Sequence, residues 1–446
     1  MNSSNVTGKL SIEQQISGQP KLKRQIGIFN ATLLGLGSIL GTGVFVSIGI
    51  SAGVAGPAVV LAIPLAALVA LFNGMSSAQL AANHPVSGGT YEYGYKWLTP
   101  ALGFTAGWMF LVAKSASAAT AALGFASYSK SLFPGLSSVS TVLLAFGTVA
   151  ALTGLVLLGI RRTSFVNTLI VSVTVGSLLW LILSGLPHVE RKNFENIGVD
   201  GGLFSVGFIE SIALMFVAYT GYGRIATLGE EIQNPRRNIP VSILTTLAVT
   251  VLLYVGIAFV AVGVLGSREL AEATSSSGTP LVQVARSIQL SGGAMVLQVG
   301  AITAMLGVLL NLILGLSRVV LAMGRRGDLF RVVTKIDKSG ETPYVAILAV
   351  GVFVGLICLL GDLKLVWSFS AFTVLIYYSI TNLCALRLTK EERLYSGLIS
   401  IAGLCSCLFL AFWVEPLIWQ FGIVILLAGL LWHTIARRFH RQSEVQ

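Results

Sequence analysis

Twelve long apolar stretches, separated by short polar or Pro/Gly-containing segments, constrain this chain more than any other feature of its sequence. A helix needs about 20 apolar residues to cross the hydrocarbon core of a bilayer. Lipid cannot hydrogen-bond to backbone groups, so spans of this composition are expected to be helical. The sequence therefore predicts an all-α polytopic membrane protein with about twelve transmembrane helices. The predicted spans are 28–50, 56–80, 97–126, 139–159, 163–187, 205–232, 239–265, 291–323, 344–361, 365–387, 396–413 and 415–436.

The composition excludes an ordinary soluble enzyme, because only 11% of the 446 residues are charged and 54% are apolar. Soluble domains carry about 25% charged residues. The chain has no phosphate-binding loop, and its four histidines are scattered without the spacing of metal ligands. We therefore expect no enzymatic activity, no cofactor and no metal site.

The distribution of basic residues predicts the orientation in the membrane. With the N-terminus in the cytoplasm, 22 of the 29 Lys and Arg residues fall in cytoplasmic segments, six fall outside, and Lys114 lies within a span. Basic residues are retained on the cytoplasmic side, so both termini are predicted to be cytoplasmic in a multi-pass plasma-membrane protein. The net charge of +11 is explained in the same way, and we expect no nucleic-acid partner.

Two glycine clusters fall near the middle of predicted spans one and six, at 37–43 (GSILGTG) and 218–223 (AYTGYG). Glycine inside a helix costs about 1 kcal/mol relative to alanine, so such a cluster marks a place where a helix can unwind. Close packing of helices through small residues is the alternative for either cluster alone. Paired interruptions in corresponding helices indicate the substrate site of a transporter. Facing half-helix ends suit a zwitterionic amino acid, because N–H groups attract its carboxylate and carbonyls its ammonium group.

Two ionisable residues lie within predicted spans. Lys114 falls about half-way along span three, and Glu210 in the outer half of span six. An ionisable group at membrane depth is a candidate functional residue. For Lys114 the alternative is a structural or snorkelling lysine, and for Glu210 a position facing an outer vestibule.

Several segments resemble those of amino acid–polyamine–organocation permeases, in the amino acid permease branch. GSILGTGVFVSIG (37–49) is similar to their first helix, FVAYTGYGRIATLGEEIQNPRRNIP (216–240) to their sixth helix and following loop, and HPVSGGTYEYGYKWL (84–98) to the link between helices two and three. The resemblance implies a LeuT-like fold of two inverted five-helix repeats, with discontinuous helices 1 and 6 and two peripheral helices. It divides the chain into a cytoplasmic tail (1–27), a first repeat (28–187), an extracellular loop (188–204), a second repeat (205–387), two peripheral helices (388–436) and a cytoplasmic tail (437–446).

The resemblance also implies roles for individual residues. Many family members carry a lysine on helix five, whereas the matching stretch here, Val171–Thr174, has none. Lys114 is therefore our candidate for supplying this charge from helix three, and Glu210 is a second coupling candidate. The other expected positions are the carboxylate site (Ser38, Ile39, Leu40, Gly41, Thr42 and Gly43), the amine site and gate (Val217, Ala218, Tyr219, Gly221 and Tyr222) and a cytoplasmic gate (Glu230, Glu231 and Arg318).

The predicted function is secondary active, alternating-access transport of an amino acid, by proton-coupled symport or by exchange. The alternatives are a polyamine or other organic-cation transporter of the same fold, and an amino acid sensor that does not transport. A channel is disfavoured because two unlike broken helices in one chain do not form a symmetric selectivity ring. The expected partners are the amino acid, a proton and the lipid bilayer. The identity of the amino acid and the oligomeric state stay open.

Overall fold

The computed structural model describes residues 24–86, 88–158, 164–195, 197, 205–227, 229, 231–289, 292–337 and 342–443. Within these ranges the chain is helical, and its one β-bridge joins Ile26 to Ile232. The elements of the first half are α2 (Ile28–Ile39), α3 (Thr42–Phe45), α4 (Ser47–Ala55), α5 (Val59–Asn83), α6 (Thr90–Trp97), α7 (Pro100–Leu132), α8 (Thr141–Leu157) and α9 (Ser164–Gly185).

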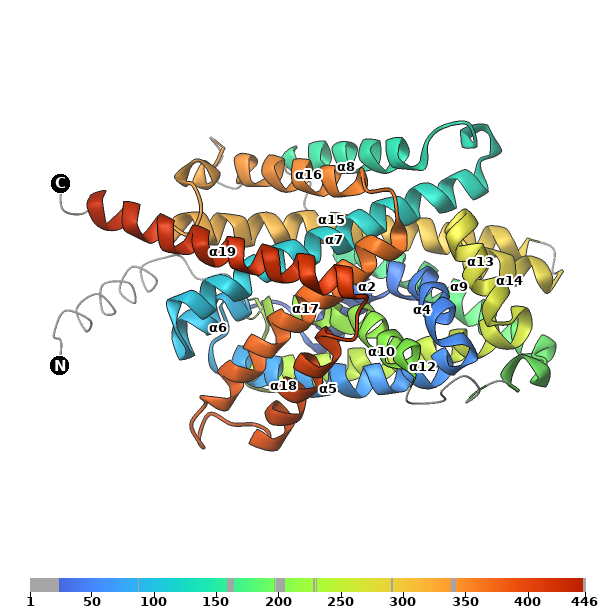
Figure 1. Ribbon diagram of the computed structural model, residues 1–446, viewed down its shortest axis with the longest axis horizontal. Helices are drawn as coiled ribbons and strands as arrows, with labels where there is room; N and C mark the ends of the chain where they lie inside the picture. Colours follow the sequence, from blue (N-terminus) through green and yellow to red (C-terminus); the bar gives the residue numbers. More distant parts are fainter. Residues whose placement is uncertain are drawn as a thin grey trace.

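The second half contains the interrupted span six and the remaining long helices (Figure 1). Its elements are α10 (Val206–Tyr219), the 3₁₀ turn η6 (Thr220–Tyr222), α11 (Gly223–Thr227), α12 (Pro235–Leu265), α13 (Ser267–Ser277), α14 (Pro280–Ser287), α15 (Gly293–Arg325), α16 (Tyr344–Cys358), α17 (Leu363–Leu386), α18 (Gly397–Ala411) and α19 (Pro416–Ser443).

Eight helical stretches of the described chain are long and apolar enough to cross a membrane, and the stretch 47–83 joins α4 and α5 into one of them. Four further apolar helices, α2, α8, α16 and α18, are shorter. The described residues thus confirm the predicted all-helical architecture and provide several helices that are long and apolar enough to span a membrane. The sequence missed α6, α13 and α14, which lie in links between predicted spans and are too short or too polar to appear as apolar stretches.

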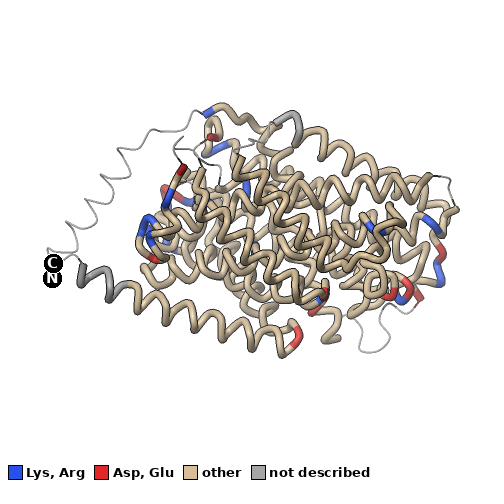
Figure 2. The backbone as a smooth tube through the Cα atoms, turned by 90° about the horizontal axis from the view of Figure 1, so that it is seen from above, with Lys and Arg blue, Asp and Glu red and all other residues tan. Residues whose placement is uncertain are grey.

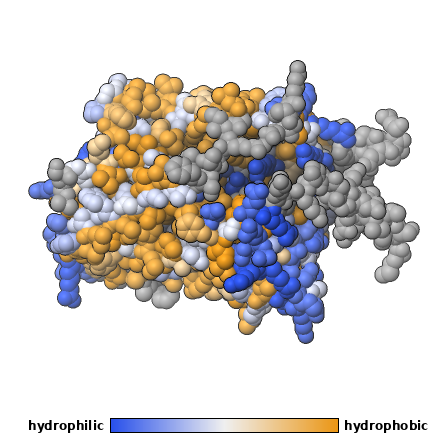
Figure 3. Space-filling model, turned by 180° about the vertical axis from the view of Figure 1, so that it is seen from behind, coloured by the Kyte–Doolittle hydropathy of each residue, from blue (hydrophilic) through white to orange (hydrophobic). Residues whose placement is uncertain are grey.

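The surface supports a membrane-embedded middle. Charged residues gather mainly at the two ends of the long axis (Figure 2), and hydrophobic residues dominate the surface between them (Figure 3). Many large apolar side chains are exposed, among them Leu183, Leu252 and Leu398. Exposed apolar surface of this extent requires a lipid or protein neighbour. The hydrocarbon core of a bilayer would supply that neighbour around the middle of the molecule.

Helix α7 lies in the centre of the bundle, where it packs against α15 and α17. It begins after Thr99, whose side chain accepts a hydrogen bond from the Leu102 N–H, with Pro100 in the first turn. Both are typical helix-start signals. Its buried face is rich in alanine and serine, so neighbouring backbones can approach closely. This close packing places the middle of α7, including Lys114, beside both interrupted spans.

Candidate functional site

Span one is interrupted twice, once within the predicted glycine cluster and once three residues after it. Helix α2 ends at Ile39, Leu40 is extended, and Gly41 (φ −170°, ψ −131°) precedes the single turn α3. A second irregular residue, Val46, separates α3 from α4. A Cβ on Gly41 would lie 2.8 Å from the Val308 Cγ2 atom. A larger residue therefore cannot fit at this break unless the Val308 side chain or α15 itself moves.

Span six is interrupted more tightly, by the 3₁₀ turn η6 between α10 and α11. Gly221 in this turn lies directly against the end of α2, because a Cβ at this position would overlap the Ser38 carbonyl and come within 2.7 Å of the Ile39 side chain. The two glycine clusters predicted from the sequence therefore meet in space, backbone against backbone.

One hydroxyl group links both interruptions. The Tyr254 side chain, from α12, is fully buried, and its hydroxyl lies 3.0 Å from the Ile39 carbonyl oxygen and 3.3 Å from the Ala218 carbonyl oxygen. Carbonyls freed by a helix break need a partner at membrane depth. A hydroxyl has one proton, so it can donate to only one of these two carbonyls at a time. The other carbonyl oxygen is then left able to accept a hydrogen bond.

A cavity of about 140 Å³ lies beside the two interruptions. This volume accommodates several water molecules or a small solute. Its lining residues come from α2 and α3, α7, the span-six segment, α15 and α17. Of the residues expected to bind the carboxylate or the amine, seven line it, namely Ser38, Ile39, Thr42, Gly43, Val217, Ala218 and Gly221.

Four of the expected residues lie outside the cavity lining: Leu40, Gly41, Tyr219 and Tyr222. The Tyr219 hydroxyl donates to the Ile63 carbonyl at 3.4 Å, and its ring packs against that of Tyr254. Tyr222 is buried against Tyr378. The aromatic side chains that do line the cavity are Phe110, Trp367, Tyr377 and Tyr378.

Lys114 is buried in the cavity wall, with 8% of its surface exposed. Its Nζ atom donates a hydrogen bond of 2.8 Å to the Thr220 Oγ1 atom in the span-six interruption. Thr220 in turn donates to the Val217 carbonyl at 2.7 Å. The ammonium group on α7 is thus connected through one side chain to the broken backbone of span six.

The remaining predicted residues are not brought together. Glu210 is half-buried near the start of α10, away from the cavity lining, and Glu230 lies outside the described residues. The Glu231 carbonyl accepts hydrogen bonds from the Gln25 and Ile26 N–H groups. Arg318 is exposed and lines the cavity. The cavity therefore extends toward the end of the bundle at which α15 terminates.

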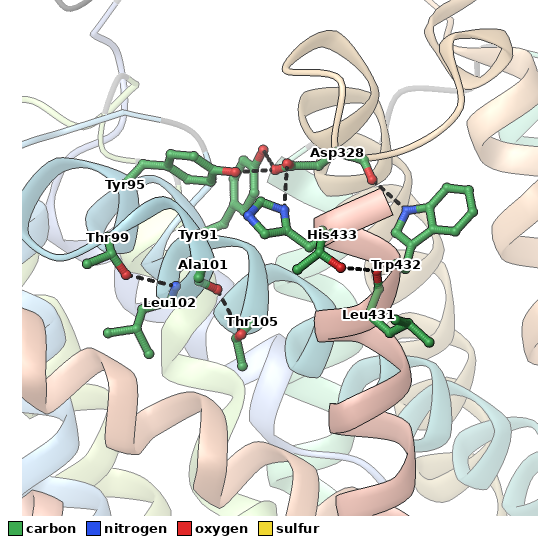
Figure 4. Close-up of polar contacts among 11 residues, drawn as sticks. Tyr91, Tyr95, Thr99, Ala101, Leu102, Thr105, Asp328, Leu431, Trp432 and His433 are labelled. Atoms are coloured by element: carbon green, nitrogen blue, oxygen red, sulfur yellow. Dashed lines mark hydrogen bonds and ion pairs between the residues drawn. The ribbon is translucent and has the colours of Figure 1, made fainter. Parts of the chain in front are cut away.

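A second polar cluster, centred on Asp328, lies just beyond the C-terminus of α15 (Figure 4). Its buried carboxylate accepts hydrogen bonds from the Tyr91 hydroxyl at 2.8 Å and the Tyr95 hydroxyl at 2.6 Å, and lies 3.3 Å from the His433 Nδ1 atom. The Asp328 carbonyl accepts from the Trp432 indole at 2.8 Å. This cluster, which the sequence did not predict, joins α6, the segment after α15 and α19.

An ion pair flanks the Asp328 cluster. The Arg326 Nη2 atom lies 2.5 Å from the Glu92 Oε2 atom, and the guanidinium group stacks 4.1 Å from the Tyr95 ring centre. Burial raises the pKa of Glu92, and Arg326 opposes that shift. Burial, with Lys96 and Arg326 nearby, lowers the pKa of His84 to about 4. His84 is therefore neutral near pH 7, where its Nδ1 atom can accept a hydrogen bond from Lys96 at 3.2 Å.

Comparisons with known proteins agree with the predicted family. A sequence profile described as amino acid permease matches residues 30–441. An uncharacterized transporter of Mycobacterium tuberculosis is 36% identical over 427 residues, covering 95% of this chain and 93% of that protein. From Bacillus subtilis, the branched-chain amino acid permease BcaP is 32% identical over 76% of each chain, and a methylthioribose transporter is 28% identical over 96% of this chain and 97% of its own.

Proposed function

The chain belongs to the amino acid permease family, and we propose that it is a secondary active transporter that moves an amino acid across the cytoplasmic membrane by alternating access. The observation that carries this proposal is the meeting of two interrupted spans beside one cavity, with Gly221 in contact with Ser38. Unwound backbone at membrane depth is tolerated where it lines a polar cavity or is buried in protein. Such paired breaks are the usual position of a transporter's substrate.

We propose twelve spans, formed by the long helices together with the four shorter apolar ones. Span one then comprises α2, α3 and α4, and span six comprises α10, η6 and α11. These spans correspond in an inverted five-plus-five arrangement, with α18 and α19 as the peripheral pair. Both termini are cytoplasmic in this proposal, in keeping with the distribution of basic residues.

The expected substrate contacts follow from the cavity lining. The carboxylate is proposed to meet the backbone near Thr42 and Gly43, where the first N–H groups of α3 have no partner within that helix. The ammonium group is proposed to meet the carbonyls near Val217 and Ala218. The cavity continues to the exposed Arg318, so with cytoplasmic termini this conformation is open toward the cytoplasm.

Lys114 is proposed as the coupling residue, for proton symport or for exchange. Its hydrogen bond to Thr220 places a charge between α7 and the span-six interruption, so loss of a proton would weaken the link between these two elements. A proton gradient can then bias the populations of two conformations, provided that protonation differs between them.

The alternative of a polyamine or other organic-cation substrate is opposed by the charges of the cavity lining. The described lining residues include Lys114, Arg224 and Arg318 but no Asp or Glu. Like charges repel strongly at low dielectric. The relatives include a branched-chain amino acid permease and a methylthioribose transporter, so family membership alone does not select the substrate.

Uptake into proteoliposomes tests the proposal. Purified protein should accumulate at least one radiolabelled amino acid above its external concentration when an inwardly directed proton gradient or an internal exchange partner is present. Empty liposomes are the control. Binding without accumulation under every imposed gradient would instead indicate a sensor, and accumulation of polyamines alone would favour the organic-cation alternative.

Cysteine labelling tests the proposed orientation independently. A cysteine at Ser276, which is exposed at the end of α13, should react with a membrane-impermeant maleimide added outside intact cells. A cysteine at Ser339, in the link after α15, should react only after the membrane is permeabilised. The parent chain provides the background, because Cys405 is exposed. The opposite labelling pattern would reverse the orientation.

A further inference from the structure

In the described part of the cavity lining, one buried side-chain amide has a nitrogen without a hydrogen-bond partner in the protein. Asn311, on α15, lines the cavity and is 9% exposed, and its Nδ2 atom is buried without a hydrogen-bond partner. Among the described residues, this is the one unpartnered buried side-chain nitrogen or oxygen that belongs to a cavity-lining residue. A buried donor without a partner costs roughly 1–3 kcal/mol.

The other polar side chains around the cavity are mostly satisfied within the protein. The Ser38 hydroxyl donates to the Leu34 carbonyl at 2.9 Å, and the Ser117 hydroxyl pairs with that of Ser370 at 2.8 Å. The Trp367 indole donates to the Leu214 carbonyl at 3.0 Å. Because these groups already have partners, the Asn311 amide differs from them in having hydrogen-bonding capacity left over.

The position of Asn311 matches the substrate's side chain rather than its main-chain groups. The proposed carboxylate and ammonium contacts come from spans one and six, whereas Asn311 lies on a different helix of the cavity lining, α15. Its cavity-lining neighbours on that helix, Val308, Leu312 and Leu316, are apolar. The terminal torsion of an asparagine is soft, so a small rotation can direct the amide toward a solute.

We propose that Asn311 is the specificity-determining residue of the cavity and selects amino acids whose side chain carries an oxygen acceptor. This inference rests on the proposed function and adds the substrate class to it. A hydroxyl, amide or carboxylate oxygen on the substrate accepts from the Asn311 Nδ2–H group. An aliphatic side chain of the same size leaves this donor unpaired, and sites built to hydrogen-bond a substrate group discriminate strongly against analogues that lack it. The Lys114 ammonium, in the same wall, opposes cationic side chains.

Equilibrium binding to the full-length chain in lipid nanodiscs tests the proposal with two isosteric pairs, threonine with valine and asparagine with leucine. In the parent protein we expect the acceptor-bearing member of at least one pair to bind roughly tenfold more tightly or better. Asn311→Leu roughly keeps the side-chain volume and removes the amide. In this variant the two members of each pair should bind with about equal affinity, and valine and leucine should still bind. Thr303→Val is the matched control, because Thr303 is a partly buried residue of α15 outside the cavity lining, and it should keep the parent preference.

The outcomes separate this inference from the proposed function. If valine and leucine bind the parent protein as tightly as threonine and asparagine, or if Asn311→Leu keeps the preference, the assignment of Asn311 is wrong although amino acid transport stands. If no amino acid binds or is taken up, the proposed function itself fails. Should Asn311→Leu not fold, equal binding within both isosteric pairs on the parent protein would still rule out the assignment.

Discussion

The cavity and the Asp328 cluster each contain a buried charged residue, Lys114 and Asp328, but the hydrogen bonding of these two residues differs. In the described part of the chain, the Lys114 Nζ atom has one hydrogen-bond acceptor, the Thr220 hydroxyl. The Asp328 carboxylate has three partners, Tyr91, Tyr95 and His433, and its carbonyl has a fourth in Trp432.

This difference separates a site that can change from a site that holds helices together. An ammonium group has three donors, so Lys114 keeps capacity for a substrate, water or a changed backbone. A buried carboxylate with several hydrogen-bond partners, as at Asp328, helps to rigidify the helices that it joins. We therefore expect substitutions around the cavity to affect transport more than stability, and substitutions in the Asp328 cluster to do the reverse.

The largest effect is expected from one methyl group at the contact between the two interrupted spans. In Gly221→Ala the new Cβ would overlap the Ser38 carbonyl, which is backbone and cannot turn away as a side chain would. Spans one and six must then separate, so substrate binding and uptake should both fall below detection. Equilibrium binding and liposome uptake measure this.

Gly315→Ala is the matched control for this substitution. Gly315 also lines the cavity, but a Cβ there would meet only the flexible Arg224 side chain, at an ordinary 3.5 Å. Binding should stay within about threefold of the parent. Parent-like uptake by Gly221→Ala would show that the contact between the interruptions is dispensable.

The next largest effect concerns transport without an equal loss of binding. Lys114→Met keeps most of the side-chain volume and removes the charge, so α7 should still pack. We expect concentrative, pH-dependent uptake to be lost, while substrate affinity falls by less than uptake. Lys130→Met makes the same change near the end of α7, where Lys130 is partly buried outside the cavity lining, and should behave as the parent does. An unchanged pH response in Lys114→Met would exclude its role in coupling.

The sequence predicted the regions of the cavity that carry a strong local signal. Glycine clusters inside apolar spans and a lysine at membrane depth are both unusual, and the interruptions and Lys114 lie together at the cavity. Tyr254 and Asn311 carry no such signal, because a tyrosine or asparagine in a long helix is common. Their importance depends on which carbonyls or cavity they face, and only the packed structure determines that.

The Asp328 cluster was missed for a related reason. Asp328 follows a predicted span and looks like an ordinary charged residue of a polar loop. Its partners lie more than 100 residues away on either side, at Tyr91, Tyr95 and His433. The aromatic residues of 84–98 supported the family resemblance, but single-sequence patterns do not indicate which distant carboxylate their hydroxyl groups meet.

The smallest effect on transport is expected from Asp328→Asn, which should instead lower stability. The neutral amide keeps the size of the carboxylate but weakens the hydrogen bonds from Tyr91 and Tyr95 and removes the charge beside His433. Hydrogen bonds to charged groups contribute about 1.5–3 kcal/mol each, so the free energy of unfolding should fall by roughly 2 kcal/mol or more. Hydrogen exchange should increase first in the part of α19 that the Asp328 cluster attaches to α6. Uptake measured well below the unfolding temperature should stay within about twofold of the parent.

Asp362→Asn is the control, since Asp362 caps α17 by accepting from the Leu365 N–H group and asparagine caps helices equally well. If Asp328→Asn instead abolishes uptake without lowering stability, the Asp328 cluster takes part in the transport cycle, and its hydrogen bonds are ones that the cycle must break.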